Sequence, residues 1–512
     1  MKELCALYLR SINIVRLPPS IRILGNLHFL CLDNCNLEDV AILGELEALQ
    51  ILSITWSPIS RLPEEIGKLM KLRLLNLNNC RWLKIIEPGA LKGLINLEEL
   101  YMKNSLDPWM GKHEELSESC VAGLAELKNM TKLAFLEISI LDPIILLEDV
   151  DLPFENLDKF CISIGHAMQM EYEGLTTMNL NLQGCGSILS KKGVEKNLQK
   201  TQRLYLSNLS EFEESPCKLC TQGFREVKYL NIKDSPSIKY IADSSNAYSS
   251  NGLPLIAFGK LESFFLQNLI NLEKICHGPI APECFNKLKA VRVEQCGKLK
   301  YLWCLSDVQG LNQLEEIKVS NCDSMQSIVT HDAREDIVST NNRVELPKVR
   351  DLVLYELPNM TSFCHTSIQV SLPHLESLTM VGLLGLEKIL YSKRSLKYSN
   401  LKKLTIRESK STLKSILKLD WILKLPNLES MMIEISPSVE VVFDLEELEE
   451  LEVIEDVEIL SRLTDLTLHE LPNLHCVCKQ DVKLQGISIL RNLRDLYIYK
   501  IGLSFLFFSV YG

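Results

Sequence analysis

The sequence predicts an α/β solenoid, a stack of coils with a concave parallel β-sheet and a mostly irregular or 3₁₀ convex side. Its 512 residues far exceed the roughly 250–300 at which a single compact core stops growing. Apolar residues make up 46% of the chain and aromatic residues only 7%, so the core must consist mainly of leucine, isoleucine and valine. One spacing of these residues recurs along the chain, which is typical of repeat architectures.

The recurring unit has apolar residues at positions i, i+3 and i+5, often Cys, Ser or Asn at i+8, and further apolar residues three apart. Positions i+3 and i+5 lie on one face of a short strand, because strand side chains alternate. The later residues suit a 3₁₀ or polyproline-like return path. Coils commonly start about 22–27 residues apart, which predicts a leucine-rich repeat horseshoe. The clearest copy is Leu288, Val291, Val293, Cys296, Leu299 and Leu302.

Stacked amphipathic helices are the competing interpretation of so many apolar residues. They would need apolar positions at i, i+3, i+4 and i+7 over ten or more residues, and the i+3, i+5 step does not fit. Prolines such as Pro63, Pro236 and Pro358 also interrupt long helices. We expect short helical turns only in some return paths, with 90–93 and 123–130 as candidates.

The array is divided by places where the pattern weakens. Residues 1–165 form N-terminal repeats with an insertion near 103–132. Residues 166–226 form degenerate repeats at which the stack could bend. Residues 227–512 form C-terminal repeats with polar loops near 243–260 and 329–347, which we expect on the surface.

Charge and cysteine content limit the functional classes. The net charge is −11 with no basic stripe, which argues against nucleic-acid binding. The 17 cysteines are scattered, and neither a signal peptide nor a membrane-length apolar stretch is visible. These observations favour reduced thiols in the cytoplasm or nucleus. An acidic stretch from Asp444 to Glu458 is either a solvated face or a docking site for a basic partner.

No motif for catalysis, cofactor binding or metal binding is found. The sequence lacks GxSxG, HExxH, DxDxDG and GxGxxG patterns, so we expect no enzyme and no cofactor. Cys217-Lys-Leu-Cys220 lacks a clean second ligand pair for zinc. The alternation in His475-Cys-Val-Cys478 favours strand or return-path packing. Cysteines at i+8, such as Cys80, are interpreted as packing residues of the turn.

The concave face is the candidate site, because a solenoid presents an extended curved surface for binding. We take positions i+4, i+6 and i+7 of each copy to point outward from the sheet. Aromatic residues and arginine at such positions are those that protein interfaces favour. The outward candidates are Trp56, Tyr101, Tyr205, Phe265, Arg292, Glu294, Lys318, Tyr355, Glu356, Arg407, Glu408, His469, Tyr497 and Tyr499.

Several runs resemble a known family. Leu62-Pro-Glu-Glu-Ile-Gly-Lys-Leu-Met-Lys-Leu-Arg-Leu-Leu-Asn-Leu77 is similar to the leucine-rich repeats of plant intracellular nucleotide-binding immune receptors. Residues 154–157, 269–279 and 314–322 resemble the coiled-coil subclass of those receptors. The resemblance covers essentially the whole chain. It implies recognition of a pathogen effector, or of a host protein that an effector alters, together with restraint of a nucleotide-binding switch.

The chain departs from that family in what it lacks. It contains no GxxxxGK[ST] loop for nucleotide phosphates and no Met-His-Asp signature. We therefore interpret it as the repeat region without the coiled-coil and nucleotide-binding domains, either a truncated gene product or a fragment. The partners implied are an effector or guarded host protein and the nucleotide-binding domain. A free-standing leucine-rich repeat scaffold or adaptor outside immunity is the alternative.

Overall fold

The chain forms two compact units, which are described separately. The N-terminal unit comprises Met1–Phe212 and Leu219–Leu230, and the C-terminal unit comprises Glu213–Lys218 and Asn231–Gly512. The computed structural model describes residues 3–105, 124–143, 157–166, 173–183, 185–190, 192–209, 216, 224–243, 258–278, 283–308, 310–331, 343–364, 368–390, 400–407, 413–445, 458–481, 488–501 and 506–511.

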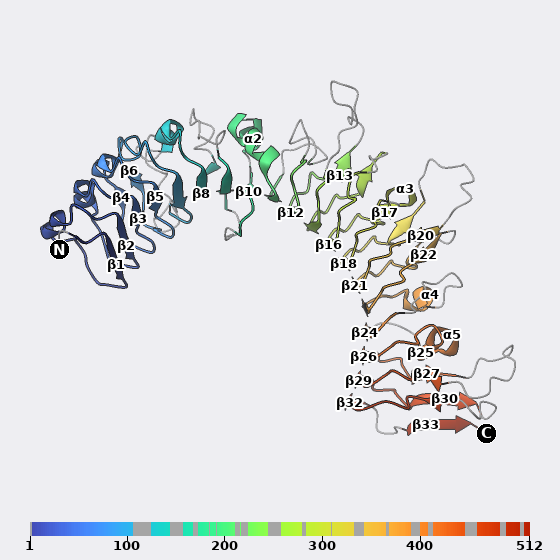
Figure 1. Ribbon diagram of the computed structural model, residues 1–512. Helices are drawn as coiled ribbons and strands as arrows, with labels where there is room; N and C mark the ends of the chain where they lie inside the picture. Colours follow the sequence, from blue (N-terminus) through green and yellow to red (C-terminus); the bar gives the residue numbers. More distant parts are fainter. Residues whose placement is uncertain are drawn as a thin grey trace. The chain divides into compact units, whose positions relative to one another are not determined.

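In the N-terminal unit, each coil adds one strand to a parallel sheet in sequence order. The parallel sheet lies on one side of the coils. Short helices lie on the opposite side, which we call the return side because the chain returns there to the next strand (Figure 1). The sheet strands are β1 (Ala6–Arg10), β2 (Phe29–Asp33), β3 (Ile51–Ser53), β5 (Leu74–Asn76), β7 (Glu99–Met102), β8 (Phe135–Ile140), β9 (Lys159–Ile164), β10 (Thr177–Asn181) and β11 (Arg203–Ser207). The return side carries β4 (Arg61–Leu62), β6 (Ile85–Ile86), α2 (Lys192–Lys200) and the 3₁₀ helices η1 (Pro19–Ile23), η2 (Ala41–Glu45), η3 (Glu64–Lys68), η5 (Glu126–Asn129) and η8 (Gly186–Ser190).

The C-terminal unit repeats this arrangement, and β12 (Tyr229–Lys233) lies where the chain passes from one unit to the other. Its parallel sheet contains β14 (Ser263–Gln267), β16 (Ala290–Glu294), β18 (Glu316–Ser320), β21 (Asp351–Tyr355), β23 (Ser377–Val381), β24 (Lys403–Arg407), β26 (Ser430–Glu434), β29 (Asp465–His469) and β32 (Asp495–Tyr499). The predicted solenoid with a parallel sheet is therefore confirmed.

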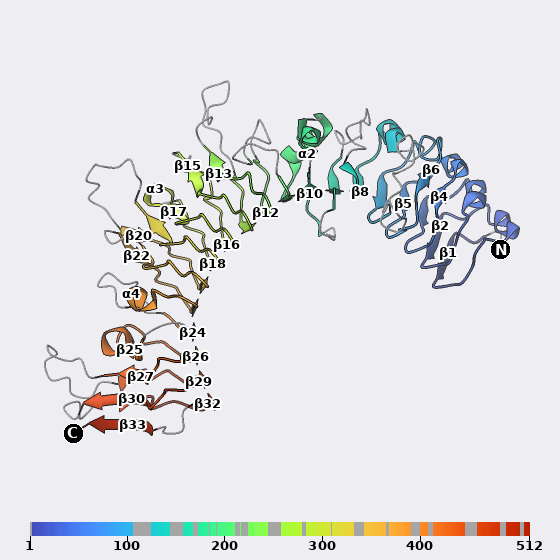
Figure 2. The ribbon, with the colours of Figure 1, turned by 180° about the vertical axis from the view of Figure 1, so that it is seen from behind.

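The return side of the C-terminal unit is richer in strands than predicted (Figure 2). It also holds α3 (Leu305–Val308), α4 (Leu386–Leu390) and α5 (Leu419–Ile422). Its strand groups are β13 (Tyr240–Asp243) with β15 (Lys274–His277); β17 (Trp303–Cys304) with β19 (Val329–Thr330); β20 (Arg343–Glu345) with β22 (Gln369–Ser371); β25 (Ser415–Lys418), β27 (Val441–Asp444), β30 (Cys476–Asp481) and β33 (Leu506–Tyr511); and β28 (Glu458–Ile459) with β31 (Ser488–Ile489).

The extra strands have a local cause in the sequence. Val442 and Phe443 are buried in β27, and Cys476 to Cys478 are buried in β30. β-branched and aromatic residues favour such half-buried extended backbone, and parallel pairing with the next coil satisfies its hydrogen bonds. The prediction that His475–Cys478 packs as a strand or return path is confirmed.

One of the two predicted helical turns is wrong. Residues 90–93 form a turn, not a helix. The carboxylate of Glu126 accepts hydrogen bonds there from the backbone N–H groups of Gly89 (2.5 Å), Leu91 (3.2 Å) and Lys92 (2.9 Å). The carboxylate of the next coil therefore takes the place of helical carbonyl acceptors. Within 123–130, the described residues do contain the helical turn η5.

The core is the stacked apolar stripe that the spacing predicts. Each repeat position of the copy beginning at Leu288 is at most 1% exposed. Complete burial of one such side chain contributes about 1.5–3 kcal/mol, and no coil can bury its stripe without a neighbour. The degenerate copies at 177–181 and 203–207 form β10 and β11, which pair in the same sheet.

The residue at i+7 turns the chain out of the strand, and the sequence did not reveal this role. It has positive φ in coil after coil, for example at Asn34 (54°), Asn79 (63°) and Asn104 (54°). Asparagine tolerates this left-handed region better than most residues. Its side chain also links coils, since Asn34 Nδ2 donates to Ser11 Oγ (3.0 Å) and Asn104 Nδ2 donates to Asn79 Oδ1 (2.9 Å).

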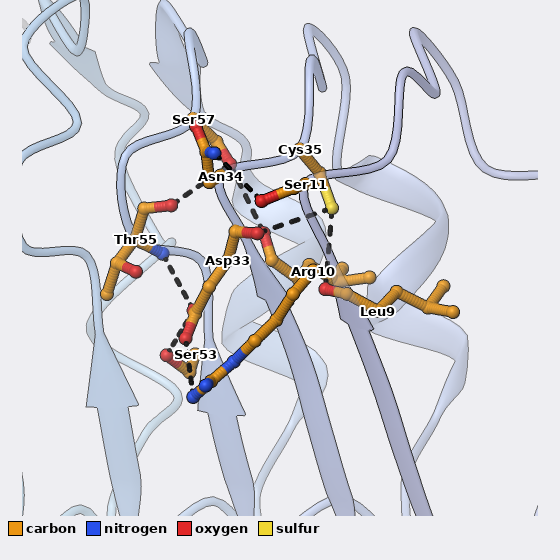
Figure 3. Close-up of polar contacts among 10 residues, drawn as sticks. Leu9, Arg10, Ser11, Asp33, Asn34, Cys35, Ser53, Thr55 and Ser57 are labelled. Carbon is orange, nitrogen blue, oxygen red and sulfur yellow. Dashed lines mark hydrogen bonds and ion pairs between the residues drawn. The ribbon is translucent and has the colours of Figure 1, made fainter.

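In the first coils of the N-terminal unit, the residue at i+8 ties its coil to the one before it (Figure 3). Cys35 Sγ donates to the carbonyl oxygen of Leu9 at 3.4 Å. Ser57 Oγ donates to the carbonyl oxygen of Leu32 at 3.2 Å. Burial raises the pKa of the Cys80 thiol at the same position to about 12. The interpretation of these cysteines as packing residues of the turn is confirmed, and their hydrogen bonds explain why serine alternates with cysteine.

Several predicted features fall outside the described residues. They are the central parts of the insertion and loops, at 106–123, 244–257 and 332–342, and residues 446–457 of the acidic stretch. The Cys217–Cys220 pair and Glu408 lie there too. The domain boundaries at 165 and 226 remain predictions.

Candidate protein-binding face

The outward side chains of each sheet form three rows, at positions i+2, i+4 and i+6. In β16, Val291 and Val293 point into the core, and Arg292 between them is exposed. The in-register pairing of neighbouring strands keeps equivalent positions side by side. We call the outward side chains of these strands the sheet face of each unit.

Most of the predicted site residues lie on these rows, as expected. They are divided between the two units, and the rows of each unit are described by themselves. Row i+4 holds Tyr101 and Tyr205 in the N-terminal unit and Phe265, Arg292, Lys318 and Tyr497 in the C-terminal unit. Row i+6 holds Glu294, Tyr355, Arg407, His469 and Tyr499, all in the C-terminal unit.

Trp56 and Glu356 are placed differently from the prediction. Both are i+7 residues beyond the end of a strand, with φ values of 55° and 49°. Their left-handed backbone turns the chain toward the return path, so they lie at the edge of the coil and not on the sheet face. The assumption that i+7 points outward from the sheet is therefore wrong.

Exposure separates the predicted aromatic residues into two groups. Tyr355, Tyr497 and Tyr499 are 38%, 48% and 54% exposed and present their rings to solvent. Tyr101 is half-buried, and its ring packs against that of Phe135 with centroids 4.7 Å apart. Tyr205 is also half-buried, and burial raises the pKa of its phenol. The exposed tyrosines are the better anchors for a partner, because aromatic residues dominate protein interfaces.

Row i+2 was missed, and it supplies acids that pair with the predicted cations. Glu316 Oε1 lies 2.9 Å from Arg292 Nε and 2.9 Å from Lys318 Nζ, which also lies 3.6 Å from Asp351 Oδ2. Burial raises the pKa of Glu316, but hydrogen bonds from Arg292 and Lys318 lower it more, so the pKa ends below its usual value. Position i+2 lies directly before the first inward residue of each strand. It could have been assigned to an outward row from the sequence, since it shares the parity of i+4.

The last strands of the C-terminal unit gather a mixed polar and aromatic cluster. His469 Nδ1 lies 4.0 Å from Glu434 Oε1, and its ring meets that of Tyr499 edge-on with centroids 6.0 Å apart. Lys500 donates to Glu470 and lowers the pKa of that carboxyl. The ends of these strands and the turns that follow them thus offer aromatic surface beside charges of both signs.

The N-terminal unit has a fixed polar cluster where its first strands end (Figure 3). Asp33 accepts hydrogen bonds from Ser53 Oγ (2.7 Å) and from the backbone N–H of Thr55 (3.2 Å), and lies 3.6 Å from the Arg10 guanidinium. Burial raises the pKa of Asp33, but the hydrogen bonds with Ser53, Cys31 and Thr55 together outweigh it, so the pKa ends below its usual value. The contacts within the cluster compensate the charge of Asp33 and link the ends of neighbouring strands.

The part of the chain that the structure describes has neither a metal-ligand cluster nor a membrane-length helix. Within the described residues, no three His, Cys, Asp or Glu side chains are grouped so that they could hold a metal ion. The described cysteines are present as thiols and not as disulfides, and burial raises the pKa of Cys478 to about 12. In the same part of the chain, no helix has the length and apolar character needed to cross a membrane.

Comparison with known proteins finds one matching family and two similar plant proteins. The family model described as plant disease resistance protein RPS2-like, leucine-rich repeats, matches residues 187–318, 260–390 and 374–509. A disease resistance protein of Arabidopsis thaliana is 26% identical over 358 residues, which cover 67% of this chain and 34% of the relative. A probable disease resistance protein of the same plant is 29% identical over 301 residues, which cover 56% and 30%. The chain thus spans about a third of the length of these relatives.

Solved structures are more distant. The functional domain of InlJ from Listeria monocytogenes is 15% identical, with a TM-score of 0.37 over 81% of this chain and 75% of that chain. A leucine-rich repeat protein of Leptospira interrogans is 14% identical, with a TM-score of 0.32 over 98% and 92%. Leucine-rich repeat folds generally serve as protein-interaction scaffolds. Because the family matches together run from residue 187 to residue 509, more than half of the sequence, the chain belongs to the RPS2-like leucine-rich repeat family of plant disease resistance proteins.

Proposed function

We propose that this chain is the protein-recognition repeat region of a plant intracellular immune receptor. In this role it senses a pathogen effector, or a host protein that an effector has modified, and restrains a nucleotide-binding switch in the cytoplasm. The observation that carries the proposal is the family match over residues 187–509, which contain most of the exposed sheet-face aromatic residues. The partner would be a protein, and no cofactor is required.

The sheet face of the C-terminal unit is the surface we assign to the partner. Tyr355, Tyr497 and Tyr499 are exposed there, and tyrosine gives contact area at a low cost in side-chain entropy. The ion pairs of Arg292 and Lys318 with Glu316 and Asp351 restrict the conformations of their side chains. Fixed side chains lose less entropy when a partner binds.

Co-expression in leaves tests the proposal. The chain would be expressed with a coiled-coil plus nucleotide-binding segment from a receptor of this family, and co-purification and the leaf cell-death response would be measured. We expect the two to associate, and Tyr355→Ala, Arg407→Ala and Tyr497→Ala to weaken the association or alter the response. Lys68→Ala, at an exposed return-side position in η3, is the matched control and should change neither. If no segment or effector associates and all three variants behave like the control, the proposal is wrong.

A free-standing scaffold outside immunity is the second hypothesis. It predicts stable binding to a protein that is neither a receptor segment nor an effector. The same three sheet-face variants would then weaken that binding without any change in the leaf response. The outcome of the co-expression experiment separates the two hypotheses.

A further inference from the structure

Trp56 is an outlier among the turn residues of the N-terminal unit. It adopts the left-handed backbone at position i+7, with φ of 55°, and it is 57% exposed. Equivalent positions with positive φ in the described coils of this unit carry small polar residues, namely Ser11, Asn34, Asn79, Asn104 and Asn208. A bulky residue in this region is strained, and strain kept at an exposed position points to function rather than packing.

The fold gains little from Trp56 at this position. Its backbone N–H donates to the carbonyl oxygen of Asn78 at 3.1 Å, a bond that any residue except proline could make. The tryptophan also interrupts the amide ladder that Asn34 and Asn104 make with their own neighbours. An asparagine would serve the coil at least as well, so the indole itself needs another explanation.

Arg81 lies over this indole, and no carboxylate among the described residues forms an ion pair with it. Its guanidinium carbon is 5.8 Å from the centroid of the Trp56 ring. Several other arginines of this unit pair with carboxylates on neighbouring coils, such as Arg61 with Glu87 (3.1 Å) and Arg73 with Glu98 (2.7 Å). For Arg81, the described part of the chain supplies the cation–π contact but no ion pair with a carboxylate. Trp82 follows it in the same turn and is 44% exposed.

We propose that Trp56, Arg81 and Trp82 form a docking site for an acidic segment of a partner protein. The site lies at the coil edge and is separate from the sheet face, so it does not depend on the proposed immune role. The guanidinium fork fits a carboxylate through two hydrogen bonds, and the indoles accept an apolar side chain next to that carboxylate. Tryptophan and arginine are also the residues that contribute most to binding at protein interfaces.

A random peptide library displayed on phage and selected on the immobilised full chain tests this site. We expect selected peptides to carry Asp or Glu next to Leu, Phe or Trp. Trp56→Asn and Arg81→Ala should each weaken their binding about tenfold or more, and Arg81→Glu should select basic peptides instead. Arg73→Ala, which removes an arginine already paired with Glu98, is the matched control and should keep wild-type affinity.

Three results would overturn the proposal. The first is that the wild-type chain selects basic or uncharged peptides. The second is that acidic peptides bind equally well to the wild type and to the Trp56 and Arg81 variants. The third is that no peptide is selected at all. Circular dichroism of each variant shows whether it folds. Arg81→Lys gives a further test, because it keeps the charge and removes the bidentate fork, and it should retain only part of the affinity.

Discussion

Gly67→Ala tests the close approach of neighbouring return segments. A Cβ atom at Gly67 would lie 2.2 Å from the carbonyl oxygen of Gly89, and one at Gly93 would lie 1.9 Å from the carbonyl oxygen of Gly67. Ordinary Cβ contacts are longer than 3.4 Å, so the backbone of one coil would have to move by more than 1 Å. No flexible side chain is available to yield in its place.

The size of the effect follows from two opposing contributions. Forcing extra volume into a packed site costs about 1–3 kcal/mol. Replacing glycine by alanine also reduces the entropy of the unfolded chain, which stabilises by about 0.4–1 kcal/mol. The net loss of stability is therefore about 1–2 kcal/mol, which corresponds to a roughly five- to thirtyfold larger equilibrium constant for local opening. The effect should be local, because each coil contacts only its neighbours.

Amide hydrogen exchange followed by mass spectrometry measures this effect coil by coil. We expect faster exchange in the coils around η3 and unchanged exchange in the C-terminal unit. Gly25→Ala is the matched control, because no atom lies within 4 Å of a Cβ built there; it should leave exchange unchanged or slow it. If Gly67→Ala exchanges like Gly25→Ala, the backbone contact does not restrict this position.

Three further predictions concern hydrogen bonds, thiols and ion pairs. Cys80→Ala should cost about 1–2 kcal/mol, because the Ile54 carbonyl loses its donor, whereas Cys80→Ser should cost less; exchange in that coil compares them. Iodoacetamide at pH 8 should alkylate exposed Cys5 but spare Cys80 and Cys478, whose pKa values are about 12, and rapid labelling of all three would contradict the burial. Arg292→Ala should change stability by under about 1 kcal/mol, because its ion pair is exposed, and a larger loss in urea unfolding would contradict this.

The buried thiols also make the stability of the folded chain depend on pH. An unfolded cysteine loses its proton near pH 9, and folded Cys80 and Cys478 lose theirs near 12. Between these values the unfolded chain binds fewer protons, so stability falls as pH rises. We expect thermal denaturation to show full stabilisation from these two thiols below pH 9 and its progressive loss toward pH 12. Cys80→Ser should show a smaller loss over the same window.

The scaffold was predictable because burial imposes period two on the strands. Val291 and Val293 identify the inward row, and the same parity gives Arg292 its outward position. Position i+2 shares that parity, so Glu316 was accessible to the same reasoning, but polar residues there carry no repeating type. The turn at i+7 was harder to predict, because its residues share a backbone conformation and not one side-chain type; Trp56 shows this most clearly.

The return side was less predictable for a related reason. Its apolar residues need only to reach the core, and both a 3₁₀ helix and a short strand achieve this. Pairing with the next coil decides between them, as when β27 pairs with β30. Such pairing depends on two coils together, so the pattern within one coil cannot determine it.

Hydroxyl-radical footprinting tests the central claim most directly, because it reports the exposure of individual side chains. The chain would be labelled alone and in complex with the co-expressed nucleotide-binding segment. We predict that Tyr355, Tyr497 and Tyr499 on the sheet face are protected in the complex, whereas Met70, which lies outside the sheet strands and is 60% exposed, is labelled equally in both. Protection of Met70 with unchanged labelling of the three tyrosines would contradict the claim that the sheet face binds the partner.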